Sequence, residues 1–347
     1  MRFHGCEVSR QSTRFALVAR FLAVALPAIT AAGAESLVAG QPPKPKPQVA
    51  GGEAKGSAAA DPRAILRNAL DADKNLPPMM MDIEVTQRYA HEEDGRHFRV
   101  NFRKSGEKLD VICHTSAFGD DGSVSDLYDD RLIWDGEKTL SRRVQGGKVQ
   151  AVLIREKPSV ARRSHAPFLF GVLDYEETHY AELLLRSANL KVRPQQKAVD
   201  GHPCYVVEGD TPQGHYTVWL DPAADFRCRK ARVWKLYDPP KPINAEEDFR
   251  FQTWEIDGVT ITSSKGVFAI TGATQVVTNV YGDGSTGRDM HKAAAKNVQC
   301  DPDFARVKAF RMDLPDGTMV REVEGTRKWV WSGGNLAPWA GSDPPGP

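Results

Sequence analysis

The stretch Val199–Pro222, VDGHPCYVVEGDTPQGHYTVWLDP, decides the fold class. It holds two strand patterns joined by a turn, and the second strand ends at Asp221-Pro222. Alternate residues of a strand point to opposite faces, and this strand carries Tyr216 on one face and Trp219 on the other. A flat sheet with one face in water would not tolerate apolar side chains on both. The pattern therefore predicts a strongly curved sheet that encloses a core or cavity.

Strand patterns recur along the body of the chain. In Phe98–Lys104, the residues Phe98, Val100 and Phe102 share one face and polar residues share the other. Similar runs are predicted at Lys108–His114, Asp130–Trp134, Val149–Arg155, Pro203–Gly209, His215–Leu220, Cys228–Leu236, Phe249–Ile256, Val259–Ser263, Gln275–Tyr281, Thr318–Val323 and Arg327–Trp331.

Asp-Gly dipeptides separate many of these runs. They begin at residues 94, 121, 135, 200, 257, 283 and 316. Glycine adopts positive φ at little cost and aspartate tolerates it, so the dipeptide is typical of tight turns between antiparallel strands. The chain is therefore predicted to be mainly β, an antiparallel meander curved into a half-open β-barrel.

Two helices are predicted to cover this sheet. The first begins after the cap Asp61, with Pro62 in the first helical position, and ends before Pro77. The second is predicted at about Asp174–Asn189, where Asp174 and Glu177 resemble a capping box. Both are amphipathic, so each is expected to lie against the core of the sheet or, as the alternative, against a membrane or partner surface.

The ends of the chain differ in composition from the body. Residues 1–34 combine arginines, a short apolar run and Ala32-Gly33-Ala34, which predicts a signal peptide and an exported, periplasmic or envelope-associated protein that is soluble after cleavage. Residues 35–60 read as a linker rich in Pro, Gly and Ala. Residues 61–332 form the predicted sheet domain, and 333–347 a flexible tail.

Charge and cysteine content limit the classes of partner. The chain has 46 Lys+Arg and 45 Asp+Glu, and loss of residues 1–34 leaves 42 and 44. Near-neutrality with mixed signs argues against nucleic acid as a partner. Four cysteines remain after cleavage: Cys113, Cys204, Cys228 and Cys300. They allow zero, one or two disulfides, and buried free thiols are an equal alternative.

No motif predicts catalysis, a cofactor or a metal. No two histidines have the i, i+4 spacing of a zinc helix, and no CxxC is present. Cys113 and His114 are neighbours in a strand and so point to opposite faces. The one enzymatic hypothesis that remains is a hydrolase that uses dispersed carboxylates. Its candidate residues are the acidic doublets Asp120-Asp121, Asp129-Asp130 and Glu246-Glu247.

The segment around the opening stretch resembles the LolA/LolB-like superfamily of exported lipoprotein-sorting and lipid-carrier proteins. The matching residues are Val199, Gly201, Cys204, Tyr205, Val207, Gly214, Tyr216, Trp219, Leu220, Asp221 and Pro222. The likeness covers residues 199–235 well and 61–332 loosely. It implies a half-open β-barrel with helices over its mouth and an apolar cavity for acyl chains, and it does not imply an enzyme.

The resemblance favours a carrier of lipid or lipoprotein acyl chains, and two other functions remain as alternatives. One is an envelope structural or interaction module with a filled core and an envelope protein as partner; the other is the hydrolase. The oligomeric state is left open. The residues predicted to line a cavity are Phe98, Phe102, Tyr216, Trp219, Trp234 and Trp254. The alternative for each is a place in a solid core.

Overall fold

The computed structural model describes residues 60–90, 95–119, 121–155, 165–173, 178–242, 248–323, 325, 327–339 and 341. The predicted signal peptide, nearly all of the linker, and the acidic residues Asp120, Asp174, Glu177, Glu246 and Glu247 lie outside these ranges. None of the described helices has the length and apolar character needed to cross a membrane.

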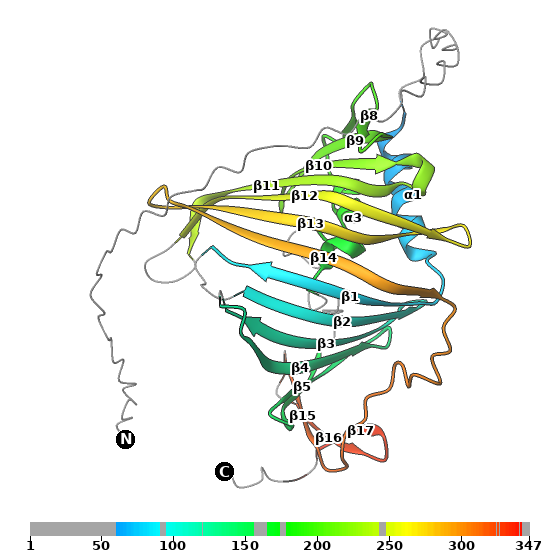
Figure 1. The fold of residues 1–347 in the computed structure, drawn as a ribbon, viewed down its shortest axis with the longest axis vertical. Helices are drawn as coiled ribbons and strands as arrows, with labels where there is room; N and C mark the ends of the chain where they lie inside the picture. Colours follow the sequence, from blue (N-terminus) through cyan, green and yellow to red (C-terminus); the bar gives the residue numbers. More distant parts are fainter. Residues whose placement is uncertain are drawn as a thin grey trace, which may run out of the picture. The chain divides into compact units, whose positions relative to one another are not determined.

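The described strands pair side by side into a sheet whose central strand is β1 (Figure 1). One run of antiparallel neighbours leads from β1 through β6, and another leads from β1 through β14 back to β9. The strands are β1 (Met79–Arg88), β2 (Gly95–Ser105), β3 (Lys108–Phe118), β4 (Val124–Trp134), β5 (Thr139–Gln145), β6 (Lys148–Arg155), β7 (Lys191–Val192), β8 (Lys197–Val199), β9 (His202–Thr211), β10 (Gly214–Asp221), β11 (Arg227–Pro242), β12 (Asp248–Ser264), β13 (Val267–Tyr281), β14 (Thr286–Cys300), β15 (Met319–Glu322), β16 (Lys328–Ser332) and β17 (Asn335–Pro338).

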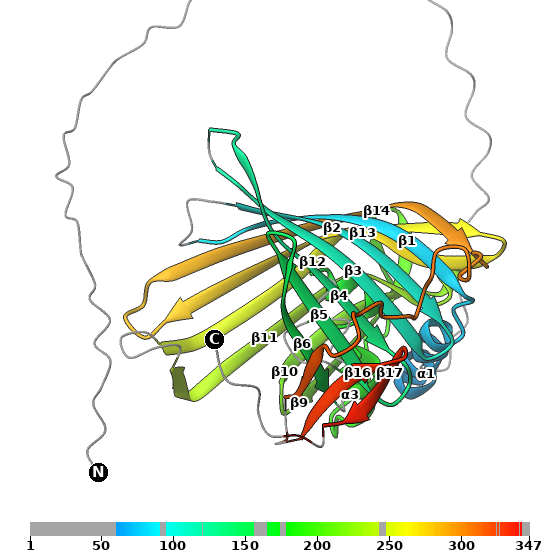
Figure 2. The ribbon, with the colours of Figure 1, turned by 90° about the horizontal axis from the view of Figure 1, so that it is seen from below.

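The sheet is curved and is not closed, and the helices lie on its concave side (Figure 2). Among the described strands no pairing joins the edge at β7 and β8 to the edge at β17. The helices are α1 (Pro62–Lys74) and α3 (Tyr180–Leu185), with 3-10 turns η1 (Pro167–Phe170) and η2 (Pro222–Ala224). The predicted mainly β, half-open meander with covering helices is confirmed.

The concave face of the sheet and the helices share one apolar core. Phe98, Tyr216 and Trp254 are each at most 2% exposed and belong to it, as do Leu66 of α1 and Leu184 of α3. Strand β10, which is part of the stretch quoted first in the sequence analysis, directs alternate residues into this core. On its convex side Trp219 is half-buried, with the Lys230 ammonium 6.0 Å from its ring centroid.

Helix α1 follows its sequence signals. The Asp61 carboxylate accepts a hydrogen bond from the Arg63 N–H at 2.9 Å, and Pro62 occupies the first helical position. The helix ends at Lys74 with Asn75 as its C-cap, before the two prolines. Ile65, Leu66 and Ala69 form the buried stripe, as predicted.

Helix α3 is shorter than predicted. It spans Tyr180–Leu185, and its N-cap is His179, whose Nδ1 accepts from the Ala181 N–H. The helix ends at Leu185 with Arg186 as its C-cap, so the predicted end at Asn189 is wrong. The apolar face that predicted the helix is nevertheless buried.

Most Asp-Gly dipeptides mark turns, but Asp257-Gly258 does not. Asp121, Asp135 and Asp283 each accept a backbone N–H two residues ahead, which fixes the turn. At Asp257-Gly258 the strand β12 continues, with a register shift against β13 and Gly258 at φ +60. The two strands predicted there are therefore one strand with a β-bulge.

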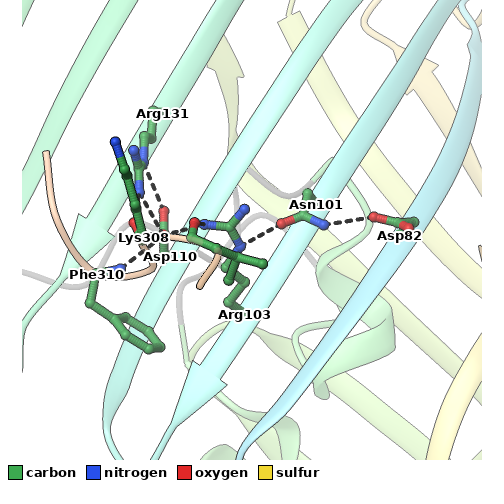
Figure 3. A network of polar contacts seen from close by, with 8 residues as sticks. Asp82, Asn101, Arg103, Asp110, Arg131, Lys308 and Phe310 are labelled. Atoms are coloured by element: carbon green, nitrogen blue, oxygen red, sulfur yellow. Dashed lines mark hydrogen bonds and ion pairs between the residues drawn. The ribbon is translucent and has the colours of Figure 1, made fainter. Parts of the chain in front are cut away.

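The segment between β14 and β15 lies on the convex face of the sheet, over β2, β3 and β4 (Figure 3). We call residues 301–311 the strap. Asp110, fully buried, accepts from the guanidinium groups of Arg103 and Arg131 and from the Phe310 N–H. Arg131 also donates to the Lys308 carbonyl at 3.0 Å. Lys308 and Phe310 have positive φ, a conformation that these contacts hold in place.

The C-terminal strands form a second, smaller core. Strand β15 pairs in parallel with β6, and Trp331 packs with Ile133, Val152 and Ile154. Strand β17 then pairs with β16 up to Pro338, so ordered structure continues past the boundary predicted at Gly333. The reason is that Leu336 packs against this second core.

All four described cysteines are free thiols. Cys204 lies on β9 and Cys228 on β11, with β10 between them. Two strand spacings are about 10 Å, beyond the reach of a disulfide. Burial raises the pKa of Cys113 and Cys228 to about 12. The separation of β9 and β11 excludes a Cys204–Cys228 disulfide, and the structure has the four cysteines as free thiols.

Candidate functional site

A pocket of about 340 Å³ lies where the concave face of the sheet meets the helices. Strands β2 and β3 supply one wall, the C-terminal end of α1 and Leu76 another, and η1 and the start of α3 the rest. Its apolar lining is Leu76, Phe102, Leu109, Phe170 and Val172. Its polar lining is Asp73, Lys104, Thr178, His179 and Glu182. A mostly apolar concavity with a few convergent polar groups is typical of small-molecule sites.

Asp73 ties three elements together beside the pocket. One of its carboxylate oxygens lies 2.7 Å from His179 Nε2, and the other accepts from Arg227 of β11. Arg227 also donates to the Ala72 carbonyl at 2.9 Å. Burial lowers the pKa of Arg227 to about 10, so this residue stays cationic at neutral pH. The carboxylate is therefore neutralised inside the fold and joins α1 to β11 and α3.

His179 is held as the neutral imidazole. Its Nδ1 accepts from the Ala181 N–H at 3.2 Å, so the ring proton is on Nε2, which donates to Asp73. Burial lowers the pKa of His179 to about 4. The ring lies directly over Gly171, where a Cβ would come within 2.1 Å of Nε2.

The two helices are also fixed to each other and to the sheet. Arg63 of α1 donates to the Leu185 carbonyl at 2.7 Å, at the end of α3. Gly209 of β9 allows α3 to approach, because a Cβ there would lie 2.9 Å from both Leu184 Cδ2 and Ser187 Oγ. The helical cover of the pocket is therefore anchored at both ends.

Lys104 is the one cation that lines the pocket. Its Nζ lies 3.4 Å from the Lys74 carbonyl oxygen and 3.4 Å from that of Leu76. Burial lowers the pKa of this lysine. Glu182, across the lining, lies 3.9 Å from Lys74 Nζ.

The six aromatics predicted to line a cavity are not gathered in one place. Phe102 lines the pocket and stacks on Phe170, with ring centroids 4.1 Å apart. Phe98, Tyr216 and Trp254 lie in the apolar core. Trp219 and Trp234 lie on the convex side, and Trp234 is 40% exposed.

The sequence did carry a signal for one pocket residue that was not predicted. Lys104 follows Phe98, Val100 and Phe102 at the same parity, so it is a charged residue on the core-facing side of β2. Phe170 and Val172 gave no such signal, since they lie in a segment without strand or long-helix periodicity.

Other candidate chemistry is dispersed. No group of three His, Cys, Asp or Glu residues in the described ranges is arranged to hold a metal ion. Cys113 is buried in the core, whereas His114 faces the opposite side and contacts Asp126 and Asp129 at 2.9 and 2.6 Å. Asp130 lies on the same side of the sheet as Cys113, where its carboxylate accepts from the Arg143 guanidinium, and Asp129 points to the other side.

No family model matches the chain, and no curated protein matches it in sequence. Solved structures that match include a DUF1329 family protein from Desulfovibrio piger, with TM-score 0.43 and 11% identity, covering 70% of this chain and 95% of that one. The lipoprotein LppX from Mycobacterium tuberculosis matches with TM-score 0.26 and 12% identity, covering 70% and 96%. A MucA/MucB complex from Pseudomonas aeruginosa matches with TM-score 0.20 and 10% identity, covering 70% and 100%.

Proposed function

We propose that the protein is an exported, non-enzymatic lipid- or lipoprotein-binding protein of the cell envelope. The observation that supports this is the pocket between Phe102 and Leu109 on the sheet and Leu76, Phe170 and Val172 on the cover. Each methylene that leaves water for such a lining contributes about 0.8 kcal/mol. The apolar core fills much of the remaining concavity, so the pocket holds the end of one acyl chain.

The binding test is native mass spectrometry of the protein purified from its own envelope. The expected result is a population with the mass of a bound lipid, which organic extraction releases. Leu109→Trp places a larger side chain in the pocket and is expected to reduce this population severalfold. Val149→Trp makes the same kind of change on β6, where Val149 is 44% exposed and outside the pocket lining, and is expected to leave it unchanged. Equal lipid content in all three proteins would refute the proposal.

The second candidate is an envelope structural or interaction module. It is favoured by the apolar core itself, in which the large side chains Phe98, Tyr216 and Trp254 are at most 2% exposed. A protein that is lipid-free when purified from its own envelope, and whose stability is unaffected by added amphiphiles, would support this module over the carrier.

A further inference from the structure

Lys104 occupies a position where the strand pattern calls for an apolar residue. Phe98, Val100 and Phe102 precede it at alternate positions of β2 and are at most 2% exposed, facing the core. Lys104 continues this series and its side chain lines the pocket beside Phe102 and Leu109. A charged group on a core-facing position has a desolvation cost unless a partner compensates it.

The acidic residues of the pocket already have other partners. Asp73 contacts Arg227 and His179, as described above. Glu182 lies 3.9 Å from Lys74 Nζ. Within the described part of the chain, no carboxylate lies within ion-pair distance of Lys104. With Arg227 and Lys74 counted as the partners of Asp73 and Glu182, the pocket and its immediate surroundings hold three cations and two carboxylates. Lys104 is the cation among them that has no carboxylate partner.

The contacts that Lys104 does make are weak. Both carbonyl oxygens lie 3.4 Å from Nζ, at the long end of hydrogen-bond distances, and both are at the C-terminal end of α1. An ammonium group has three donors, so it retains capacity for a further acceptor. An anion that enters the pocket can provide that acceptor and the missing charge together.

Building on the proposed lipid-binding function, we infer that the pocket selects anionic amphiphiles. The carboxylate or phosphate of the ligand accepts from Lys104 Nζ, and its hydrocarbon chain lies against Leu76, Phe102, Leu109 and Phe170. A neutral amphiphile of equal chain length gains only the apolar contacts.

Calorimetric titration of the full exported chain tests this with five probes. Decanoate and decyl phosphate carry a chain and a charge, decanol carries the chain alone, and acetate and inorganic phosphate carry the charge alone. Decanoate or decyl phosphate is expected to bind about tenfold to a hundredfold more tightly than decanol, the range for a hydrogen bond to a charged group. Acetate and inorganic phosphate are expected not to bind measurably.

Two variants of Lys104 isolate the charge. Lys104→Met removes the charge and the donor, and Lys104→Gln removes the charge but keeps a donor for the α1 carbonyls. Both are expected to lose the preference for decanoate over decanol while decanol affinity is unchanged, and Lys104→Arg is expected to retain the preference. Lys108→Met, an exposed lysine on β3, is the matched control and is expected to behave as the parent. If Lys104→Met does not fold, Lys104→Gln decides.

The outcomes separate this inference from the proposed function. Equal binding of decanol and decanoate would overturn the selection for anions and leave the lipid pocket standing. A preference that survives in Lys104→Gln would also overturn it. Binding of inorganic phosphate as tight as that of decyl phosphate would show an ion site without a lipid site. Failure of all the amphiphiles to bind would contradict the proposed function itself.

Discussion

Gly171 is the residue that allows the ring of His179, which lines the pocket, to pack against the backbone. Its φ of +74 favours glycine, and the ring of His179 lies where a Cβ would be. Gly284, with φ +86, has open space around the same position. The two glycines therefore share a backbone requirement, but only Gly171 is buried and has a close contact at the Cβ position.

Alanine at these two glycines should have different effects. Gly284→Ala is expected to cost about 1 kcal/mol because of its backbone conformation alone. Gly171→Ala is expected to cost about 1 to 3 kcal/mol more, because the methyl group displaces the His179 ring. Urea denaturation of both variants measures the difference. Equal losses of unfolding free energy would contradict the close packing of His179 on Gly171.

His179 should make the protein less stable in mild acid. Its folded pKa of about 4 lies below the unfolded value of about 6.5, so the unfolded chain binds more protons between these values. Stability is therefore lost as pH falls through this range, by about 2 kcal/mol at pH 5. His179→Asn keeps a capping side chain, and its unfolding free energy should fall less between pH 7 and pH 5. An identical decrease in parent and variant would assign the pH dependence to other groups.

At the scale of the elements, the strap is held against the sheet by buried charge. Asp110→Asn keeps the size of the side chain but leaves Arg103 and Arg131 without their carboxylate. The expected loss is about 3 to 5 kcal/mol. Glu84→Gln removes the ion pair with Lys296, whose partners are 47% and 60% exposed, and should cost at most about 1 kcal/mol. Chemical denaturation measures both, and similar losses would mean that the strap does not depend on this cluster.

Elements with strong local signals could be predicted from the sequence, and elements defined by their neighbours could not. Helix α1 has its cap, its first-turn proline and its apolar stripe within the segment itself. Strand β14 includes Lys292 to Lys296, KAAAK, whose alanines favour a helix, and it is a strand because it lies between β13 and β1. Strand β1 was not predicted, although Met81, Ile83 and Val85 alternate with polar residues.

The site could be predicted only in part for a similar reason. Phe102 was found because a strand pattern alone places it on the core-facing side. Leu76, Phe170 and Val172 reach the pocket through contacts between segments about 100 residues apart in the chain, and local spacing contains no trace of such contacts. Trp234 was predicted to line the cavity because it is aromatic. On β11 it alternates with the core-facing Val233, so its side chain lies on the convex side of the sheet.

At the scale of the whole molecule, the two apolar cores should respond separately to mutation. Trp331 belongs to the C-terminal core, whereas the pocket borders the larger one. Trp331→Ala is expected to destabilise residues 312–338 by about 3 to 5 kcal/mol while decanoate affinity is unchanged. Hydrogen exchange localises the loss. Faster exchange in α1 and α3 as well would show that the cores unfold as one unit.

The pairing of β1 with β14 has a consequence for how the chain acquires its structure. Residues 79–88 of β1 pair with β14 only when residues 286–300 have been made, so the centre of the sheet is completed late in synthesis. Such distant partners make folding slow, because a long loop must close before the pairing stabilises it. Strand β1 meanwhile offers an open edge to any other extended peptide. A chaperone that shields nascent strands is therefore expected to raise the yield of this protein more than that of a helical protein of equal length.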